Sequence, residues 1–161
     1  MKLGHKAIAT LREWGAFADD RRSLLIEGDK FSIVSEVTAA DKMSCSLSHL
    51  GMQPRQPAQL TADQLKAWGE RITNRVRYLL EAIETVELDA PQGRLLLRST
   101  PPEKKSNGAV LYYELLLETT GQLRLERYRY NVADRTRTPE PLHCTHELLE
   151  KLIDDLIASA P

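Results

Sequence analysis

The residues best suited to chemistry in this 161-residue chain are its cysteines and histidines, most of which fall in two short windows. Cys45 and His49 lie four residues apart in the first window, and the second window holds His143, Cys144 and His146. Thiolate and imidazole groups are the ligands that Zn²⁺ prefers, so these five residues form a candidate metal site. However, neither window has the spacing of a typical zinc site. Side chains four apart on a strand share a face but lie ~13 Å apart. The pattern therefore favours structural roles, with Cys45 in the core and His146 in the first turn of a helix.

Cys144 is also a candidate nucleophile, because it lies close to a predicted helix N-terminus and such a position lowers the pKa of a thiol. The adjacent His143 is poorly placed to act as its base, since neighbouring side chains on an extended segment point to opposite sides. The sequence also lacks the G-x-G-x-x-G and G-x-x-x-x-G-K patterns of nucleotide-binding loops. We therefore predict no cofactor, and the residue patterns favour a protein that is not an enzyme.

A long antiparallel hairpin is predicted over residues 109–131, and the rest of the chain is organised around it. Matching Leu117 with Leu123 leaves residues 119–121 as a three-residue loop. Gly121 would occupy the left-handed position of this loop, which only glycine adopts without steric cost.

The apolar pattern changes phase in the second half of this hairpin. Leucines occupy odd positions up to Leu125, whereas the later bulky residues are Tyr128 and Tyr130. A period of two that shifts by one residue predicts a β-bulge. We place it near residues 126–127, where it would bring Tyr113 close to Tyr128.

Arginines alternate with tyrosines in the return strand of the hairpin, as at Arg127, Tyr128 and Arg129. Such a surface can stack on single-stranded nucleic acid and neutralise its phosphates. The alternative is a solvated face on which the arginines pair with glutamates of the hairpin, such as Glu114 and Glu126. The net charge of -1 and the isoelectric point near 6.4 favour the second interpretation, so nucleic acid is the less favoured partner.

The length predicts one domain over residues 1–161 with a substantial core. Two cysteines do not make a disulfide framework, which favours a reducing compartment. Charged residues interrupt the N-terminal segment where a signal peptide would be apolar. No segment approaches the ~20 apolar residues of a membrane-spanning helix. We expect a cytoplasmic protein that is not bound to a membrane.

Three amphipathic helices are predicted from apolar residues at helical spacing. They cover residues 5–18, residues 61–80 and a segment that begins after Thr145, whose side chain is predicted to cap it. Thr61 and Gln64 have the spacing of a capping box, in which each side chain satisfies a free backbone N–H group.

Short strands are predicted between the helices. Residues 24–28 and 31–38 predict a hairpin about Gly28-Asp29 that pairs Ile26 with Phe31. Further strands are predicted at residues 43–49, 83–89 and 94–99. Prolines and polar residues predict connectors without strands at residues 51–60, 101–108 and 134–143.

These elements predict an α+β fold with a predominantly antiparallel sheet of about seven strands, in the order α-βββ-α-ββββ-α. This order is similar to the layout of bacterial secretion-chaperone-like domains. The resemblance lies in the order of the elements and not in any motif, and it implies a dimer that binds other proteins. The near-neutral charge of the chain departs from the strongly acidic balance that is typical of those chaperones.

Apolar residues on both faces of the predicted sheet indicate an interaction surface. Leu116 and Leu96 lie on otherwise polar faces of their strands, and three helices suffice to cover one face of a sheet. The leading hypothesis is a non-enzymatic protein-binding or chaperone-like module whose partner is another protein or a second copy of the chain. The alternatives are a metal-dependent or small-ligand enzyme that uses the cysteine and histidine windows, and a protein that binds single-stranded nucleic acid. The candidate interaction residues are Leu96, Tyr112, Leu116, Arg124, Arg127, Tyr128 and Arg129.

Overall fold

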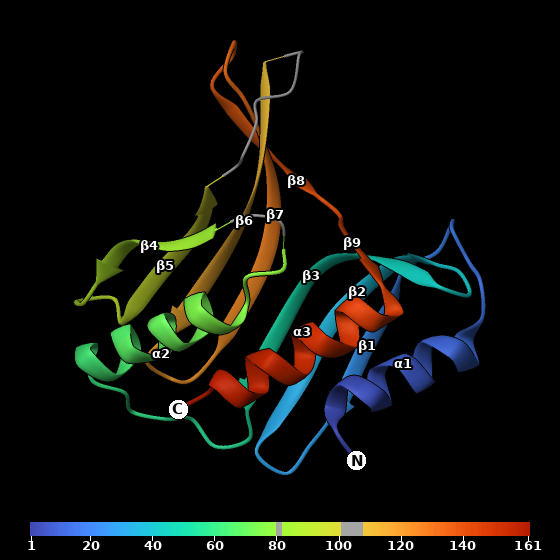
Figure 1. Ribbon diagram of the computed structural model, residues 1–161, viewed down its shortest axis with the longest axis horizontal. Helices are drawn as coiled ribbons and strands as arrows, with labels where there is room; N and C mark the ends of the chain where they lie inside the picture. The colour runs from blue at the N-terminus through green and yellow to red at the C-terminus, as the bar shows by residue number, and fades with distance from the viewer. Residues whose placement is uncertain (80–81, 101–107) are drawn as a thin grey trace.

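The computed structural model describes residues 1–79, 82–100 and 108–161, which form three helices and a nine-stranded antiparallel sheet (Figure 1). The helices are α1 (Leu3–Trp14), α2 (Ala62–Arg75) and α3 (His146–Ser159). The strands are β1 (Arg22–Glu27), β2 (Phe31–Ala40), β3 (Ser44–Pro54), β4 (Ala82–Asp89), β5 (Arg94–Thr100), β6 (Ala109–Glu118), β7 (Leu123–Asn131), β8 (Thr136–Glu140) and β9 (Leu142–Thr145). Seven strands follow one path, β1-β2-β3-β7-β6-β5-β4, while β8 pairs with β7 and β9 with β3. The predicted α+β class with a predominantly antiparallel sheet is confirmed.

All three helices lie on the same face of the sheet (Figure 1). α1 packs beside β1 and α3, α3 contacts β3 and β9, and α2 lies over β4, β5 and β6. The approach of α2 to β5 is close, because a Cβ atom added to Gly69 would lie 2.6 Å from Cδ2 of Leu95. Trp68 and Leu97 are fully buried in the same region. One face of the sheet and the apolar faces of the helices therefore form a single core.

Both predicted helix caps are confirmed. The hydroxyl oxygen of Thr61 accepts a hydrogen bond from the backbone N–H of Gln64, and the side-chain oxygen of Gln64 accepts one from the backbone N–H of Thr61, at 3.2 and 2.9 Å. At the start of α3, the hydroxyl of Thr145 accepts a hydrogen bond from the backbone N–H of Leu148. These caps satisfy N–H groups that have no partner within their own helix.

Two of the helices are shorter than predicted. α1 ends at Trp14, where Gly15 adopts a φ of 74° that side-chain-bearing residues rarely adopt. α2 ends at Arg75, although Val76 and Leu79 remain buried. The apolar pattern therefore continued beyond the helix because the chain stays in the core after leaving helical geometry.

The turn between β1 and β2 differs from the prediction by one residue. Ile26 pairs with Ile33, and the backbone N–H of Gly28 donates a hydrogen bond to the carbonyl oxygen of Phe31. The two-residue loop is therefore Asp29-Lys30, and the predicted pairing of Ile26 with Phe31 is wrong. The observed partner of Ile26 is two residues further along β2 than the predicted one. A shift of two residues leaves each side chain on the same face, so the hydrophobic pattern is compatible with both registers.

β3 changes face near its centre. Leu47 and Leu50 are both fully buried although their positions differ in parity, because the pairing with β2 is irregular between Ser35 and Ala39. His49 consequently lies on the opposite face from the buried Cys45.

The predicted connector over residues 51–60 is wrong over its first four residues, since β3 continues through Gly51 and ends at Pro54. Proline is tolerated at a strand end because it removes little of the ladder.

The hairpin of β6 and β7 has the predicted turn but no bulge. Leu117 pairs with Leu123, and Gly121 has a φ of 92°. From this turn the register runs without interruption to the other end of the hairpin, so Tyr112 pairs with Tyr128. The predicted bulge near residues 126–127 is therefore wrong, as is the predicted proximity of Tyr113 to Tyr128.

The change of phase instead marks a change in which face of the hairpin is apolar. As far as Leu125, the leucines face the helices and are buried. Beyond this point the hairpin extends past the helices (Figure 1). Arg127 and Arg129 then take the side that the leucines occupied, and the bulky side chains move to the other face at Tyr128 and Tyr130.

The segment after β7 forms two strands where the sequence predicted irregular structure. β8 pairs with β7, whereas β9 pairs with β3. β3 and β7 pair directly at three positions, from Leu50 with Leu125 to Met52 with Leu123, so the segment changes partner where these two strands diverge. Pro141 lies between β8 and β9, where its lack of a backbone N–H interrupts neither ladder.

Most of the predicted loop over residues 101–108 lies outside the described residues. Within the described ranges, no helix is long and apolar enough to cross a membrane.

Candidate interaction surface

The face of the sheet opposite the helices carries a row of residues that crosses all seven strands of the main path. In order along the sheet, the row consists of Leu25, Val34, Gly51, Arg124, Leu116, Leu96 and Glu87, each paired with the next. We refer to these residues as the cross-sheet row. None of the three helices in the described part of the chain lies over it (Figure 1). Leu25 is 58% exposed, and the other aliphatic members are partly exposed. Apolar side chains therefore lie on both sides of a central glycine and arginine.

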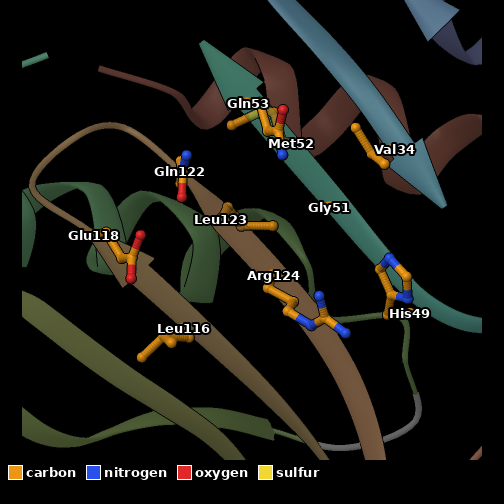
Figure 2. A pocket seen from close by; sticks show the side chains of 10 residues that line it. All are labelled: Val34, His49, Gly51, Met52, Gln53, Leu116, Glu118, Gln122, Leu123 and Arg124. Carbon is orange, nitrogen blue, oxygen red and sulfur yellow. The ribbon is translucent and has the colours of Figure 1, made fainter. Parts of the chain in front are cut away.

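A hollow of about 190 Å³ lies at the centre of the cross-sheet row, over Gly51 (Figure 2). Val34 borders it on the β2 side, and Leu116 on the β6 side. Arg124 and His49 lie at one end of the hollow, and Figure 2 shows the guanidinium group of Arg124 directed toward the imidazole ring. The amide side chains of Gln53 and Gln122 and the carboxylate of Glu118 lie toward the other end. The hollow thus has apolar side chains on two sides and polar groups at both ends.

The polar groups at the arginine end are held by neighbours on the same face. Nε of Arg124 donates a hydrogen bond to Oε1 of Glu126 at 2.8 Å, and the arginine side chain is 51% exposed. Nδ1 of His49 lies 3.0 Å from the hydroxyl oxygen of Ser48. Partial burial, and secondly the positive charge of Arg124, lower the pKa of His49. His49 is therefore a neutral imidazole at neutral pH, and Arg124 carries the positive charge of the hollow.

Tyrosines and arginines form a second cluster on this face, beyond the hollow along β6 and β7. The ring centroids of Tyr112 and Tyr128 are 5.9 Å apart. The guanidinium of Arg137 lies 3.9 Å from the centroid of Tyr128, and that of Arg98 lies 5.1 Å from the centroid of Tyr112. Glu114 pairs with both arginines, at 2.7 Å to Arg137 and 3.9 Å to Arg98. The aromatic and charged groups of this cluster therefore contact one another within the chain, although Nε of Arg98 has no hydrogen-bond partner in the described part of the structure.

The seven candidate interaction residues divide between the two sides of the sheet. Five of them share the helix-free face: Leu96, Tyr112, Leu116, Arg124 and Tyr128. Arg127 and Arg129 project to the other side, where Arg127 stacks on Tyr113 at 5.2 Å and Arg129 pairs with Glu140 at 2.7 Å. The arginine and tyrosine residues of the return strand thus do not form one continuous basic surface.

Comparison of the chain with protein families, with curated proteins and with solved structures found no match.

The fold brings some residues of the two cysteine and histidine windows together. Cys45 and Cys144 are direct partners across β3 and β9, and both thiols are buried. His143 pairs with Ser46 on the other side of the same ladder, where its Nδ1 lies 2.7 Å from the serine hydroxyl. His146 is buried at the start of α3. His49 lies on the helix-free face, so the five residues do not converge.

The chemistry of this region follows from burial of the two thiols. Desolvation raises the pKa of Cys45 to about 12 and that of Cys144 to about 11. The lowering of the Cys144 pKa that the nearby helix N-terminus predicted is thus reversed, because burial disfavours the thiolate. Among the described residues, no group of three or more histidine, cysteine, aspartate or glutamate side chains has an arrangement that could hold a metal ion.

Four members of the cross-sheet row were not among the interaction residues predicted from the sequence: Leu25, Val34, Gly51 and Glu87. Leu25, Val34 and Gly51 depend on the registers of β1, β2 and β3, and the register of the first hairpin and the extent of β3 were predicted wrongly. The alternation of His49, Gly51 and Gln53 with the buried Leu50 and Met52 is the signal that could have identified the strand.

Proposed function

We propose that the protein is a non-enzymatic, chaperone-like module that binds a segment of another protein on the helix-free face of its sheet. The observation that carries this proposal is the cross-sheet row, which lies opposite a face that all three helices cover. A sheet with apolar residues on both faces is stabilised when both faces are covered, and exposed apolar rows rimmed by polar groups are typical of protein-binding sites.

The length of the row supports a polypeptide rather than a small ligand. Seven strands at a spacing of ~4.8 Å extend over ~29 Å, which is the length of a helix of about 20 residues. Small ligands occupy enclosed cavities and bury most of their surface in them. The hollow over Gly51 is open and holds about 190 Å³, which is one side chain rather than a whole ligand.

The geometry gives less support to the two alternatives. For a nucleic-acid interface, Arg137 and Arg98 on the helix-free face would have to leave their shared carboxylate partner, Glu114. For an enzyme of the cysteine and histidine windows, the thiols would have to ionise although burial raises their pKa.

The test of the proposed function is selection from a displayed library of random 20-residue peptides. The immobilised protein selects peptides, and their dissociation constants are then measured for the wild type and for Leu116→Lys. Val132→Lys serves as a control, because Val132 is 45% exposed in the turn between β7 and β8. We expect Leu116→Lys to weaken binding at least about tenfold, because it places a charge in the row, and Val132→Lys to leave binding unchanged. Peptides that bind both variants equally would overturn the proposal.

Sedimentation of the free protein adds a second readout. If the occupant of the face is a second copy, the wild type sediments as a dimer that Leu116→Lys dissociates and Val132→Lys does not. That result would also contradict the proposal that the face takes a segment of another protein.

A further inference from the structure

We propose that the hollow over Gly51 is a subsite for a carboxylate side chain, an aspartate or glutamate that the bound segment carries between apolar residues. This inference rests on the proposed function and names the chemistry of the segment that the cross-sheet row would take. Four observations support it: the glycine, the size of the hollow, its polar groups and the residues on either side.

The fold does not require a glycine at position 51. Gly51 does not have a positive φ in this structure, unlike Gly15, Gly93, Gly108 and Gly121. A Cβ atom added to Gly51 would lie 3.4 Å from the carbonyl oxygen of Val34 and 3.7 Å from that of Leu123, which are ordinary contacts. A glycine inside a central strand weakens that strand, and such a glycine often marks a place where a ligand approaches the backbone. The missing side chain is what opens the hollow.

The hollow has the size of one side chain. Its volume is about 190 Å³, and its walls are the neighbouring strands on either side of β3. A whole backbone segment cannot enter such a space, because the paired strands close its floor. A side chain that projects from a segment lying across the row can enter it.

Arg124 supplies the charge that would select a carboxylate. Only its Nε is bonded to Glu126, and no other carboxylate lies within ion-pair distance of its guanidinium among the described residues. Its terminal amino groups are therefore free for a second carboxylate, and a guanidinium can hold two acceptors at once. Bonds between a guanidinium and a carboxylate are stronger than bonds between neutral groups.

His49 adds a second donor beside Arg124. When the hydroxyl of Ser48 donates to Nδ1 of His49, the neutral ring carries its proton on Nε2 and can donate it to an acceptor in the hollow. The carboxylate of Glu118 lines the opposite end, where it is 3.6 Å from Nε of Arg94. A carboxylate entering the hollow would thus bind at the Arg124 end, away from Glu118.

The residues on either side define what flanks the acid. Val34 and Leu25 follow Gly51 toward one edge of the sheet, and Leu116 and Leu96 follow Arg124 toward the other. A segment lying along the row would contact aliphatic side chains before and after the hollow. We therefore expect an acidic residue between two apolar patches.

The experiment uses the peptides selected on the wild type and repeats the selection on Arg124→Gln, on Arg124→Glu and on a control, Arg21→Gln. Arg21 is an exposed arginine that also makes one ion pair, at 2.7 Å to Glu36. On the wild type and the control we expect peptides with an aspartate or glutamate flanked by apolar residues. On Arg124→Gln the apolar residues should remain and the acid should disappear. On Arg124→Glu a lysine or arginine should take its place.

Binding measurements make the same comparison quantitative. Replacing the acid of a selected peptide by its amide, Asp to Asn or Glu to Gln, should weaken binding to the wild type about tenfold or more and have little effect on binding to Arg124→Gln. Filling the hollow by Gly51→Leu should remove the preference for the acid, and circular dichroism should show that this variant is folded.

The outcomes separate this inference from the proposed function. Peptides that depend on Leu116 but carry no acid, or that carry an aromatic residue stacked on Arg124, would overturn the carboxylate subsite and leave the proposed function standing. Peptides that are insensitive to Leu116→Lys would overturn both.

Discussion

The two faces of the sheet are built from the same strands but by different chemistry. On the helix-covered face, residues such as Leu97 and Leu115 are fully buried beneath the helices. On the helix-free face, the same strands carry ion pairs, stacked tyrosines and arginines, and the partly exposed aliphatic residues of the cross-sheet row. Burial on the helix-covered face therefore supplies most of the stability of the fold, and the residues of the other face are less constrained by it.

The hairpin of β6 and β7 contains this contrast within a single pair of strands. Where α2 lies over the sheet, the leucines face the helix and the charged residues face solvent. Where the hairpin extends beyond the helices, Tyr112 and Tyr128 pack against each other on the other face. The location of the helices, and not an irregularity of the strands, thus decides which face is apolar.

The largest expected difference between the faces concerns leucine truncation. Leu97→Ala removes a fully buried side chain and should lower the free energy of unfolding by about 2–5 kcal/mol. Leu116→Ala removes a partly exposed side chain and should lower it by less than about 1 kcal/mol. Urea denaturation of both variants measures the difference. Equal losses would mean that the helix-free face is covered in the free protein.

Thiol reactivity should differ between the two faces at neighbouring residues of β3. Burial raises the pKa of Cys144 from 9.0 to about 11. At pH 8 the thiolate fraction of Cys144 should therefore be about a hundredfold lower than that of an exposed thiol. The thiolate fraction of Cys45 should be lower still, because its pKa is raised to about 12. Ser46→Cys in a Cys45→Ala, Cys144→Ala background places a thiol on the next residue of β3, facing the other way. We expect it to react with iodoacetamide much faster than the native thiols. Native thiols that react as fast as this control would contradict the burial.

The same pKa shifts predict a loss of stability at alkaline pH. Because the folded-state pKa of both cysteines is raised, the unfolded chain loses its thiol protons first as the pH rises. The thiols therefore leave stability unaffected below about pH 9, and the free energy of unfolding should fall as the pH increases from there toward 11 and 12. Comparison with the double alanine variant, which lacks these thiols, isolates their share of the loss.

Alanine substitution of two glycines should also affect the two faces differently, with smaller changes in stability. Gly69→Ala places a methyl group 2.6 Å from Cδ2 of the buried Leu95, and we expect a destabilisation of about 1 kcal/mol after the gain in helix propensity. Gly51→Ala makes no close contact, and we expect it to stabilise by about 0.5 kcal/mol because it restricts the unfolded chain. Thermal unfolding of the two variants should therefore give shifts of opposite sign. Destabilisation by Gly51→Ala would show that the fold requires this glycine.

The smallest expected effect is electrostatic and local to the hollow. The positive charge of Arg124 is the second cause, after burial, of the lowered pKa of His49. Arg124→Gln should therefore raise the His49 pKa partway toward its ordinary value, as followed by NMR titration of the ring protons. Arg21→Gln should leave it unchanged. An unchanged His49 pKa in Arg124→Gln would show that the guanidinium does not lie close to the imidazole, which would contradict the proposed subsite.

Local signals in the sequence predicted the local features of the fold. The capping box of Thr61 and Gln64 and the glycine turn at residues 119–121 depend on residues close together in the chain, and both were predicted correctly. The fold class followed from the periods of the apolar residues.

The features that sequence reasoning missed depend on partners far away in the chain. Pro139 and Pro141 argued against strands, yet β8 and β9 form because β3 and β7 diverge and leave each of them a free edge. The change of face within β3, which separates His49 from Cys45, arises from irregular pairing with β2. The hollow over Gly51 required the registers of several strands at once, so its residues could not be assembled from the sequence.

Methyl NMR tests the difference between the two faces most directly. A peptide selected on the wild type is titrated into protein with labelled leucine and valine methyl groups. We expect chemical-shift changes concentrated at Val34, Leu116 and Leu96, with the methyl groups of Leu97 and Leu115 little changed. Shifts concentrated on the helix-covered side, or at neither set of residues, would contradict the assignment of the helix-free face as the binding surface.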